Sequence, residues 1–106
     1  MNPRILQIAG ELKRRLEPLY GERLQKVVVF GSYVRGEETD ESDLDVAIVL
    51  DPKYDDLTEW NLAGSLFVEI DLAFDVVVDT HIISLEEYND RDYAILRAIH
   101  SEGVTV

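Results

Sequence analysis

Residues 26–50 read KVVVFGSYVRGEETDESDLDVAIVL, and this stretch contains the two strands that decide the fold. Residues 26–30 (KVVVF) are mostly apolar and β-branched, which is typical of a short buried strand. Residues 44–50 (LDVAIVL) have the same character. Between them, a glycine–serine pair ends the first strand, and residues 32–36 have the length of one helical turn before an acidic loop. We therefore expect two neighbouring strands joined by a turn and a polar loop.

Helices are expected on both sides of this stretch. Pro3 suits the first turn of a helix, and Gly21 is typical of a residue that ends one. Between them, apolar residues recur at helical spacing: Ile5, Ile8, Leu12, Leu16 and Leu19. We expect a second helix to open at Pro52 and to carry its own apolar stripe, with the tryptophan in the core: Leu57, Trp60, Ala63, Phe67 and Ile70.

The last third of the chain predicts one more strand, one more helix and a short edge strand. Residues 74–78 (FDVVV) form an apolar run of strand length. Ser84 and Glu87 have the spacing of a capping box, which starts a helix that we expect to continue to Gly103. Residues 104–106 then add the edge strand. The order of elements predicts an α+β fold, in which helices pack on a small mixed sheet in two layers.

Composition narrows the class of protein. The 106 residues suffice for one domain, 1–106, with a modest core. The chain contains no cysteine, which excludes disulfides and thiolate metal sites. We find no apolar run of membrane-spanning length and no signal peptide, so we expect a cytoplasmic protein without membrane association. Ten basic and 22 acidic residues give a formal charge of -12, which argues against stable nucleic-acid binding and suits a basic protein partner.

Two aspartates at the start of the second strand are the first candidates for chemistry. Asp43 and Asp45 are two positions apart, so on a strand they face the same side, about 6–7 Å apart. Two carboxylates in a small volume repel each other, and a hard divalent cation with oxygen ligands removes that repulsion. Two such cations about 3.5–4 Å apart clamp the attacking and leaving oxygens of phosphoryl transfer. The alternative is that both acids only end a strand at the surface.

The glycine–serine pair is the second candidate. Gly31 directly follows a buried strand, where the absence of a side chain lets the backbone approach a ligand closely. A helical turn that starts at Ser32 would direct free N–H groups toward a phosphate, and the serine hydroxyl adds a donor. The alternative is a plain turn. The ten residues between Ser32 and Asp43 allow the chain to return and place this turn beside the two carboxylates.

The combination of Gly31-Ser32, the stretch YVRGEETDES and Asp43-Leu44-Asp45 resembles the signature of the DNA-polymerase-β-like nucleotidyltransferases. The small size of the chain and the amino-acid sequence of residues 31–50 resemble those of the minimal nucleotidyltransferases, or MNT proteins. The signature covers about 20 residues, and the order of elements is compatible with the family over nearly the whole chain.

The resemblance implies a third acidic residue on an adjacent strand. Asp75 fits best because apolar residues flank it within the expected strand 74–78. Asp79 and Asp71 remain alternatives. On this interpretation Asp43, Asp45 and Asp75 are the catalytic and metal-binding residues.

Gly31, Ser32 and Arg35 are the candidate nucleotide-binding residues. Arg35 follows the expected phosphate turn and is predicted to contact a phosphate or the base, although an ordinary solvated arginine is the alternative. The other basic residues and the two histidines are expected to have structural or surface positions: Arg23, Lys26, Arg91, Arg97, His81 and His100.

The resemblance also implies a reaction and a partner. Two Mg²⁺ ions (or Mn²⁺) would bridge the triphosphate of ATP, and a hydroxyl would attack its α-phosphorus. In MNT proteins that work as antitoxins, the acceptor is a tyrosine of a HEPN-domain ribonuclease toxin, which receives AMP. The alternatives are an antitoxin that neutralises its HEPN toxin by binding alone, and a transferase for small molecules. The second is disfavoured because no accessory helical domain is present.

Overall fold

The computed structural model describes residues 1–90 and 92–106. The helices are α1 (Pro3–Tyr20), α2 (Ser32–Arg35), α3 (Asp56–Phe74), α4 (Leu85–Asn89) and α5 (Ala94–Glu102), with a 3₁₀ turn at Gly21–Arg23. The strands are β1 (Leu24–Phe30), β2 (Leu44–Leu50), β3 (Val78–Ser84) and β4 (Val104–Thr105), in the sheet order β3-β2-β1-β4. β1 is antiparallel to β2 and β4, whereas β2 and β3 are parallel. The predicted α+β fold with a small mixed sheet is confirmed.

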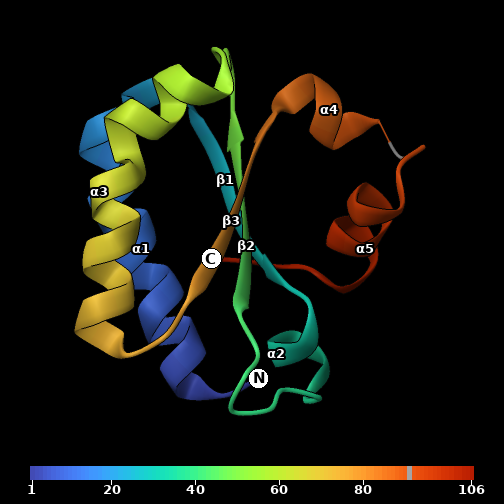
Figure 1. Cartoon of the computed structure of the whole chain (residues 1–106). Helices are drawn as coiled ribbons and strands as arrows, with labels where there is room; N and C mark the ends of the chain where they lie inside the picture. Colours follow the sequence, from blue (N-terminus) through green and yellow to red (C-terminus); the bar gives the residue numbers. More distant parts are fainter. Residues whose placement is uncertain (91) are drawn as a thin grey trace.

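Helices cover both faces of the sheet. α1 and α3 lie together on one side, and α4 and α5 lie on the other (Figure 1). Because strand side chains alternate, Val27 and Val29 belong to the larger core beneath α1 and α3. Val28 and Phe30 belong to a smaller cluster with residues of α5. The sheet is therefore a middle layer, one layer more than predicted. None of the described helices is long and apolar enough to cross a membrane.

The first helix and the first two strands follow the sequence closely. Asn2 caps α1, Pro3 occupies its first turn, and Gly21 ends it with a positive φ of 56°. The predicted stripe is buried except at Leu19, which is 39% exposed, and Tyr20 is buried in its place. The turn after β1 is also confirmed, since α2 begins at Ser32.

The expected strand at residues 74–78 is wrong. α3 continues to Phe74, which packs against the larger core, and Asp75 ends the helix with a left-handed φ of 51°. Aspartate adopts this conformation more readily than most residues, so the helix ends here without a glycine. Asp71 then accepts a hydrogen bond from the backbone N–H of Val78, the first residue of β3. The real strand starts where the expected one ends.

The beginning of α3 also differs from the expectation. Pro52 lies outside the helix, and Asp55 caps it by accepting a hydrogen bond from the backbone N–H of Thr58. Ala63, Phe67 and Ile70 are buried as predicted. Leu57 and Trp60 are 67% and 51% exposed, and the residue of this first turn that is buried is Glu59.

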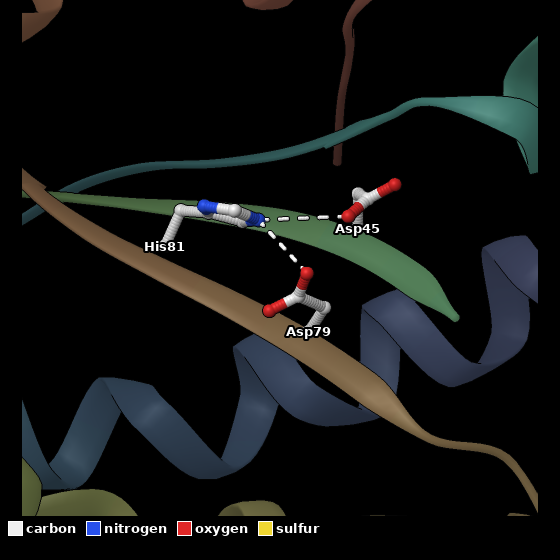
Figure 2. A group of neighbouring side chains, drawn as sticks. All are labelled: Asp45, Asp79 and His81. Carbon is white, nitrogen blue, oxygen red and sulfur yellow. Dashed lines mark ion pairs between the residues drawn. The ribbon is translucent and has the colours of Figure 1, made fainter. Parts of the chain in front are cut away.

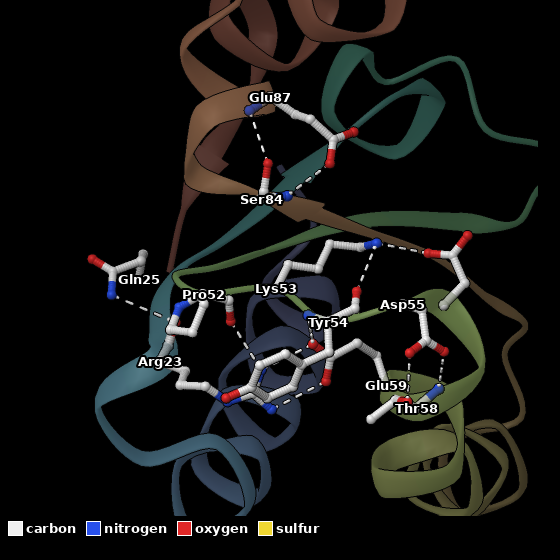
Figure 3. Close-up of polar contacts among 11 residues, drawn as sticks. Arg23, Gln25, Pro52, Lys53, Tyr54, Asp55, Thr58, Glu59, Ser84 and Glu87 are labelled. Carbon is white, nitrogen blue, oxygen red and sulfur yellow. Dashed lines mark hydrogen bonds and ion pairs between the residues drawn. The ribbon is translucent and has the colours of Figure 1, made fainter.

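Glu59 is buried because it has a charged partner. Both oxygens of its carboxylate accept hydrogen bonds from the guanidinium of Arg23, at 2.9 and 3.1 Å (Figure 3). The arginine also donates to the carbonyl of Pro52 and lies 4.6 Å from the ring of Tyr54. Arg23 is therefore part of a buried cluster, and its expected surface position is wrong.

The final helix is divided in two. Ser84 and Glu87 form the predicted capping box at the start of α4 (Figure 3). That helix ends at Asn89, and α5 begins at Ala94. Gly103 ends α5 as predicted, and the predicted edge strand is β4, which pairs with β1. Arg91, expected at the surface, lies outside the described residues.

Candidate active site

Asp45 and Asp79 lie side by side at the same end of the sheet. They occupy paired positions in the parallel register of β2 and β3. Because Leu44, Val46 and Val78 point into the larger core, both aspartates face the opposite side, toward the cluster that contains α5. Two acidic side chains from different strands thus meet on one face.

His81 completes a group of three on this face (Figure 2). It is two residues beyond Asp79, so its imidazole stands on the same side of β3. Its Nε2 atom lies 3.5 Å from Oδ1 of Asp45 and 3.4 Å from Oδ2 of Asp79. One ligand atom from each of the three residues lies within 4.8 Å of the others, a spacing that suits a single metal ion.

The glycine after β1 lies against this group. Phe30 pairs with Asp45 in the antiparallel register of β1 and β2, which brings Gly31 to the aspartate side chain. Gly31 has a φ of 84°, and a Cβ atom at this position would overlap Oδ2 of Asp45. The predicted proximity of the glycine turn and the carboxylate is therefore present.

Electrostatics of the group favour a cation. Burial and the adjacent charge of Asp79 raise the pKa of Asp45, while His81 opposes this rise. The Nε2 atom of His81 is buried and makes no hydrogen bond within the described part of the chain. Two carboxylates and an imidazole nitrogen are ligands that divalent metals accept. The residues present therefore fit a metal ion.

The three predicted acids do not form one group, because Asp45 lies with Asp79 and His81 while Asp43 and Asp75 border a cavity. Asp75, the cap of α3, does not belong to the group around Asp45. It lines a cavity of about 510 Å³ together with Asp43 and Asp71. The correction for Asp75 has a simple cause: the residue was placed on a strand, but the helix continues past Phe74 and Asp79 takes the strand position beside Asp45.

Asp43 lies directly before β2 and is exposed. Its neighbour two residues on, Asp45, is already within the strand and partly buried. Asp43 therefore borders the cavity that Asp71 and Asp75 line. Among the described residues, it is not a member of the compact group of three.

Of the predicted nucleotide-binding residues, Gly31 and Ser32 lie beside the group of three, whereas Arg35 forms ion pairs with other residues. Gly31 and Ser32 begin α2 beside Asp45. Arg35, at the end of this turn, forms ion pairs with Glu37 at 3.0 Å and with Glu102 at 2.9 Å. These hydrogen bonds raise the pKa of Arg35. The arginine thus links α2 to the end of α5.

In the sequence, Asp79 was only an alternative to Asp75, and His81 was expected to have a structural or surface position. The signal was nevertheless present in the order Asp79-Thr80-His81, because residues two apart on a strand share a face. This shared face can be recognised only when residues 78–84 are identified as the strand. His100, also expected to be structural, stacks on Tyr88 with ring centroids 4.3 Å apart.

Comparison with known proteins defines the class. Residues 10–105 match the family described as polymerase β, nucleotidyltransferase. The chain belongs to this nucleotidyltransferase family.

Two relatives narrow the comparison. A protein of Methanocaldococcus jannaschii, provisionally named protein adenylyltransferase MJ0604, is 32% identical over 94 residues, which cover 88% of each chain. The protein adenylyltransferase MntA of Shewanella oneidensis is 34% identical over 55 residues, 52% of this chain and 40% of MntA.

Solved structures have the same fold. A toxin–antitoxin complex with AMP-PNP is similar with a TM-score of 0.59 and 25% identity, covering 90% of this chain and 69% of that one. A tri-AMPylated HEPN toxin of S. oneidensis in complex with its MNT antitoxin gives a TM-score of 0.58 at 20% identity, covering 95% and 70% of the two chains. At this identity the second likeness concerns the fold alone.

Proposed function

We propose that this chain is a metal-dependent protein adenylyltransferase that transfers AMP from ATP to a tyrosine of a HEPN-domain toxin, and that it acts as the antitoxin. The observation that carries the proposal is the position of Asp45 and Asp79 on paired residues of adjacent strands, next to Gly31. The names of the two relatives and the complex with AMP-PNP support the nucleotide and the type of reaction.

Asp45 and Asp79 are the residues that we assign to a divalent ion, with His81 as a further ligand. Asp43 borders the cavity that Asp71 and Asp75 also line. Mg²⁺ or Mn²⁺ bound there would neutralise the triphosphate and lower the pKa of the attacking hydroxyl. Without a cation, the acidic site of a chain with charge -12 repels a triphosphate. The group of described residues suits one ion, and Asp43 lies outside it.

The chain's own residues position the nucleotide. Gly31 lets the backbone approach a phosphate, and the hydroxyl and N–H of Ser32 are donors at the start of α2. The acceptor oxygen forms a bond to the α-phosphorus, the bond to pyrophosphate breaks, and pyrophosphate takes the electron pair. A carboxylate oxygen of Asp79 accepts the proton of the acceptor hydroxyl. Catalysis is then mostly positioning and charge neutralisation.

The test uses α-labelled ATP, Mg²⁺ and the product of the neighbouring gene as acceptor. We expect label on a tyrosine of that partner, and a loss of at least about 100-fold with Asp45→Asn. Asp51→Asn is the matched control, because Asp51 directly follows the other end of β2 and is exposed. If Asp45→Asn still neutralises the toxin in cells without labelling it, neutralisation proceeds by contact alone and the proposed role of AMP transfer in the antitoxin is wrong.

A further inference from the structure

We propose that the free edge of β3 is a docking site for an extended, basic segment of a partner polypeptide, which adds to the sheet as a further strand. β3 is at the end of the sheet order and pairs with β2 alone among the described strands. An edge strand presents unpaired backbone groups that another chain can use. Addition of a strand to such an edge is a recurrent mode of peptide recognition.

The open part of this edge is short and well defined. The carbonyl of Val77 accepts a hydrogen bond from Leu44 of β2, so odd-numbered residues direct their amide groups to β2 and even-numbered residues direct theirs outward. At the two ends of the edge, Asp71 accepts from the N–H of Val78 and Glu87 accepts from the N–H of Ser84. Among the described residues, Thr80 and Ile82, between these capped ends, are the ones open to a partner strand.

A hollow adjoins these two residues. Asp56 and Trp60 of α3 line a cavity of about 370 Å³ together with Thr80 and Ile82. Trp60 is 51% exposed, although its ring is large and apolar. The edge therefore offers backbone hydrogen bonds beside a pocket that accepts one apolar side chain, which is the arrangement that strand addition requires.

The acidic residues near the edge of β3 favour a basic partner segment. Asp56 is the charged residue of the hollow, and its carboxylate is 92% exposed while it pairs with Lys53. Asp79, on the same strand, is 51% exposed. A second copy of a chain with charge -12 would bring like charges to this edge, whereas lysine and arginine side chains complement it. The favoured occupant is thus a basic segment of another protein.

The position of the edge connects this surface with the candidate site. A residue that pairs opposite Asp79 or His81 projects its side chain on the same face, with the added strand about 4.8 Å from β3. A tyrosine there lies within reach of the carboxylates, because aromatic side chains extend to diagonal neighbours. That the docked segment presents the acceptor tyrosine rests on the proposed function, but the docking itself does not.

A fluorescein-labelled eight-residue peptide of alternating lysine and β-branched residues, with one central tyrosine, tests the docking. We expect saturable binding by anisotropy, a change in the emission of Trp60, which is the single tryptophan, and slower amide exchange at Thr80 and Ile82. The same peptide with N-methylated backbone amides should bind on the order of tenfold more weakly or worse. Replacement of its lysines by glutamate should abolish binding.

Variants of the chain locate the site. Asp56→Lys and Trp60→Ala should each weaken the peptide at least about fivefold, whereas Leu72→Ala, at an exposed position of the same helix, should leave it unchanged. The proposal is overturned if the basic peptide does not bind, or if N-methylation has no effect. It is also overturned if Thr80 and Ile82 become protected with rising protein concentration alone, because a second copy then occupies the edge.

The reaction is scored separately with Asp45→Asn. This variant should bind the peptide with unchanged affinity and transfer no label to it. Binding without any transfer by the unmodified chain would contradict the acceptor assignment and leave the docking intact. Absence of binding, with transfer to the natural partner retained, would contradict the docking and leave the proposed function intact.

Discussion

Gly31 lies so close to Asp45 that a methyl group on Gly31 would overlap the Oδ2 atom of the carboxylate. We expect Gly31→Ala to displace the aspartate and to lower nucleotidyl transfer at least about 100-fold. Because Gly31 has a positive φ, an alanine at this position also destabilises the fold by about 1–3 kcal/mol. The measurement is label transfer from ATP, together with chemical unfolding.

Gly36→Ala separates these two effects. Gly36 also has a positive φ, of 72°, but a Cβ atom there would meet open space. This variant should lose about 1 kcal/mol of stability and keep its transfer activity. Equal loss of activity in both variants would show that backbone strain, and not the position of Asp45, explains the effect of Gly31→Ala.

Asp79→Asn and Asp75→Asn distinguish the two candidates for the third acid. Asp79 is beside Asp45, so its neutralisation should lower transfer by about 100-fold or more. Asp75 caps α3 in a left-handed conformation that asparagine adopts equally well, so its substitution should keep both stability and activity. Steady-state labelling of both purified variants gives the answer, and the reverse result would restore Asp75.

His81→Asn tests the imidazole as a metal ligand. Removal of Nε2 from the group should weaken Mn²⁺ binding about 10- to 100-fold in calorimetry, because one ligand of the set is lost. His100→Asn is the control, since His100 packs against Tyr88 and is not a member of the group of three. Unchanged Mn²⁺ affinity in His81→Asn would make His81 a packing residue beside Phe30, whose ring centroid is 5.3 Å away.

Glu59→Gln should destabilise the protein by about 2–3 kcal/mol near neutral pH, because it leaves Arg23 partly buried without its counter-charge. The hydrogen bonds from Arg23 lower the pKa of Glu59 below 4.5. The pair therefore contributes its full stability above that value, and the contribution is lost as the pH falls through the lower, folded-state pKa.

Urea unfolding from pH 7 to pH 3 measures this dependence. The difference between the unmodified chain and Glu59→Gln should shrink toward the acid end. Glu69→Gln, at a side chain that is 65% exposed, should stay within about 0.5 kcal/mol throughout. A difference that is constant with pH would mean that Glu59 contributes by packing and not by its charge.

The predictable part of the fold is the part with strong local signals. The first helix has a proline start, a glycine end and a clear stripe, and the β1–turn–β2 unit has two apolar runs around Gly31. The third strand was placed four residues early because the apolar run at residues 74–78 is compatible both with the end of a helix and with a strand. Where a strand begins in a sheet depends on tertiary packing, and the periodicity of the sequence does not show that packing.

The same displacement explains what was missed at the site. Asp45 and Gly31 were predicted because the glycine–serine pair and the two aspartates stand at the spacing of the family signature. With the third strand displaced, Asp79 fell at a strand end and His81 had no strand at all. The burial of Glu59 was equally invisible, because it depends on Arg23, 36 positions away.

Because Asp45 pairs with Asp79, an ion bound by both carboxylates would make the melting temperature depend on ion occupancy. Like charges at one register position, one of them partly buried, oppose folding of the cation-free protein. Divalent ions should therefore raise the melting temperature in proportion to the logarithm of their concentration above Kd. In Asp79→Asn the cation-free protein should melt higher and respond less, so that a thermal titration alone identifies the carboxylates that share the ion.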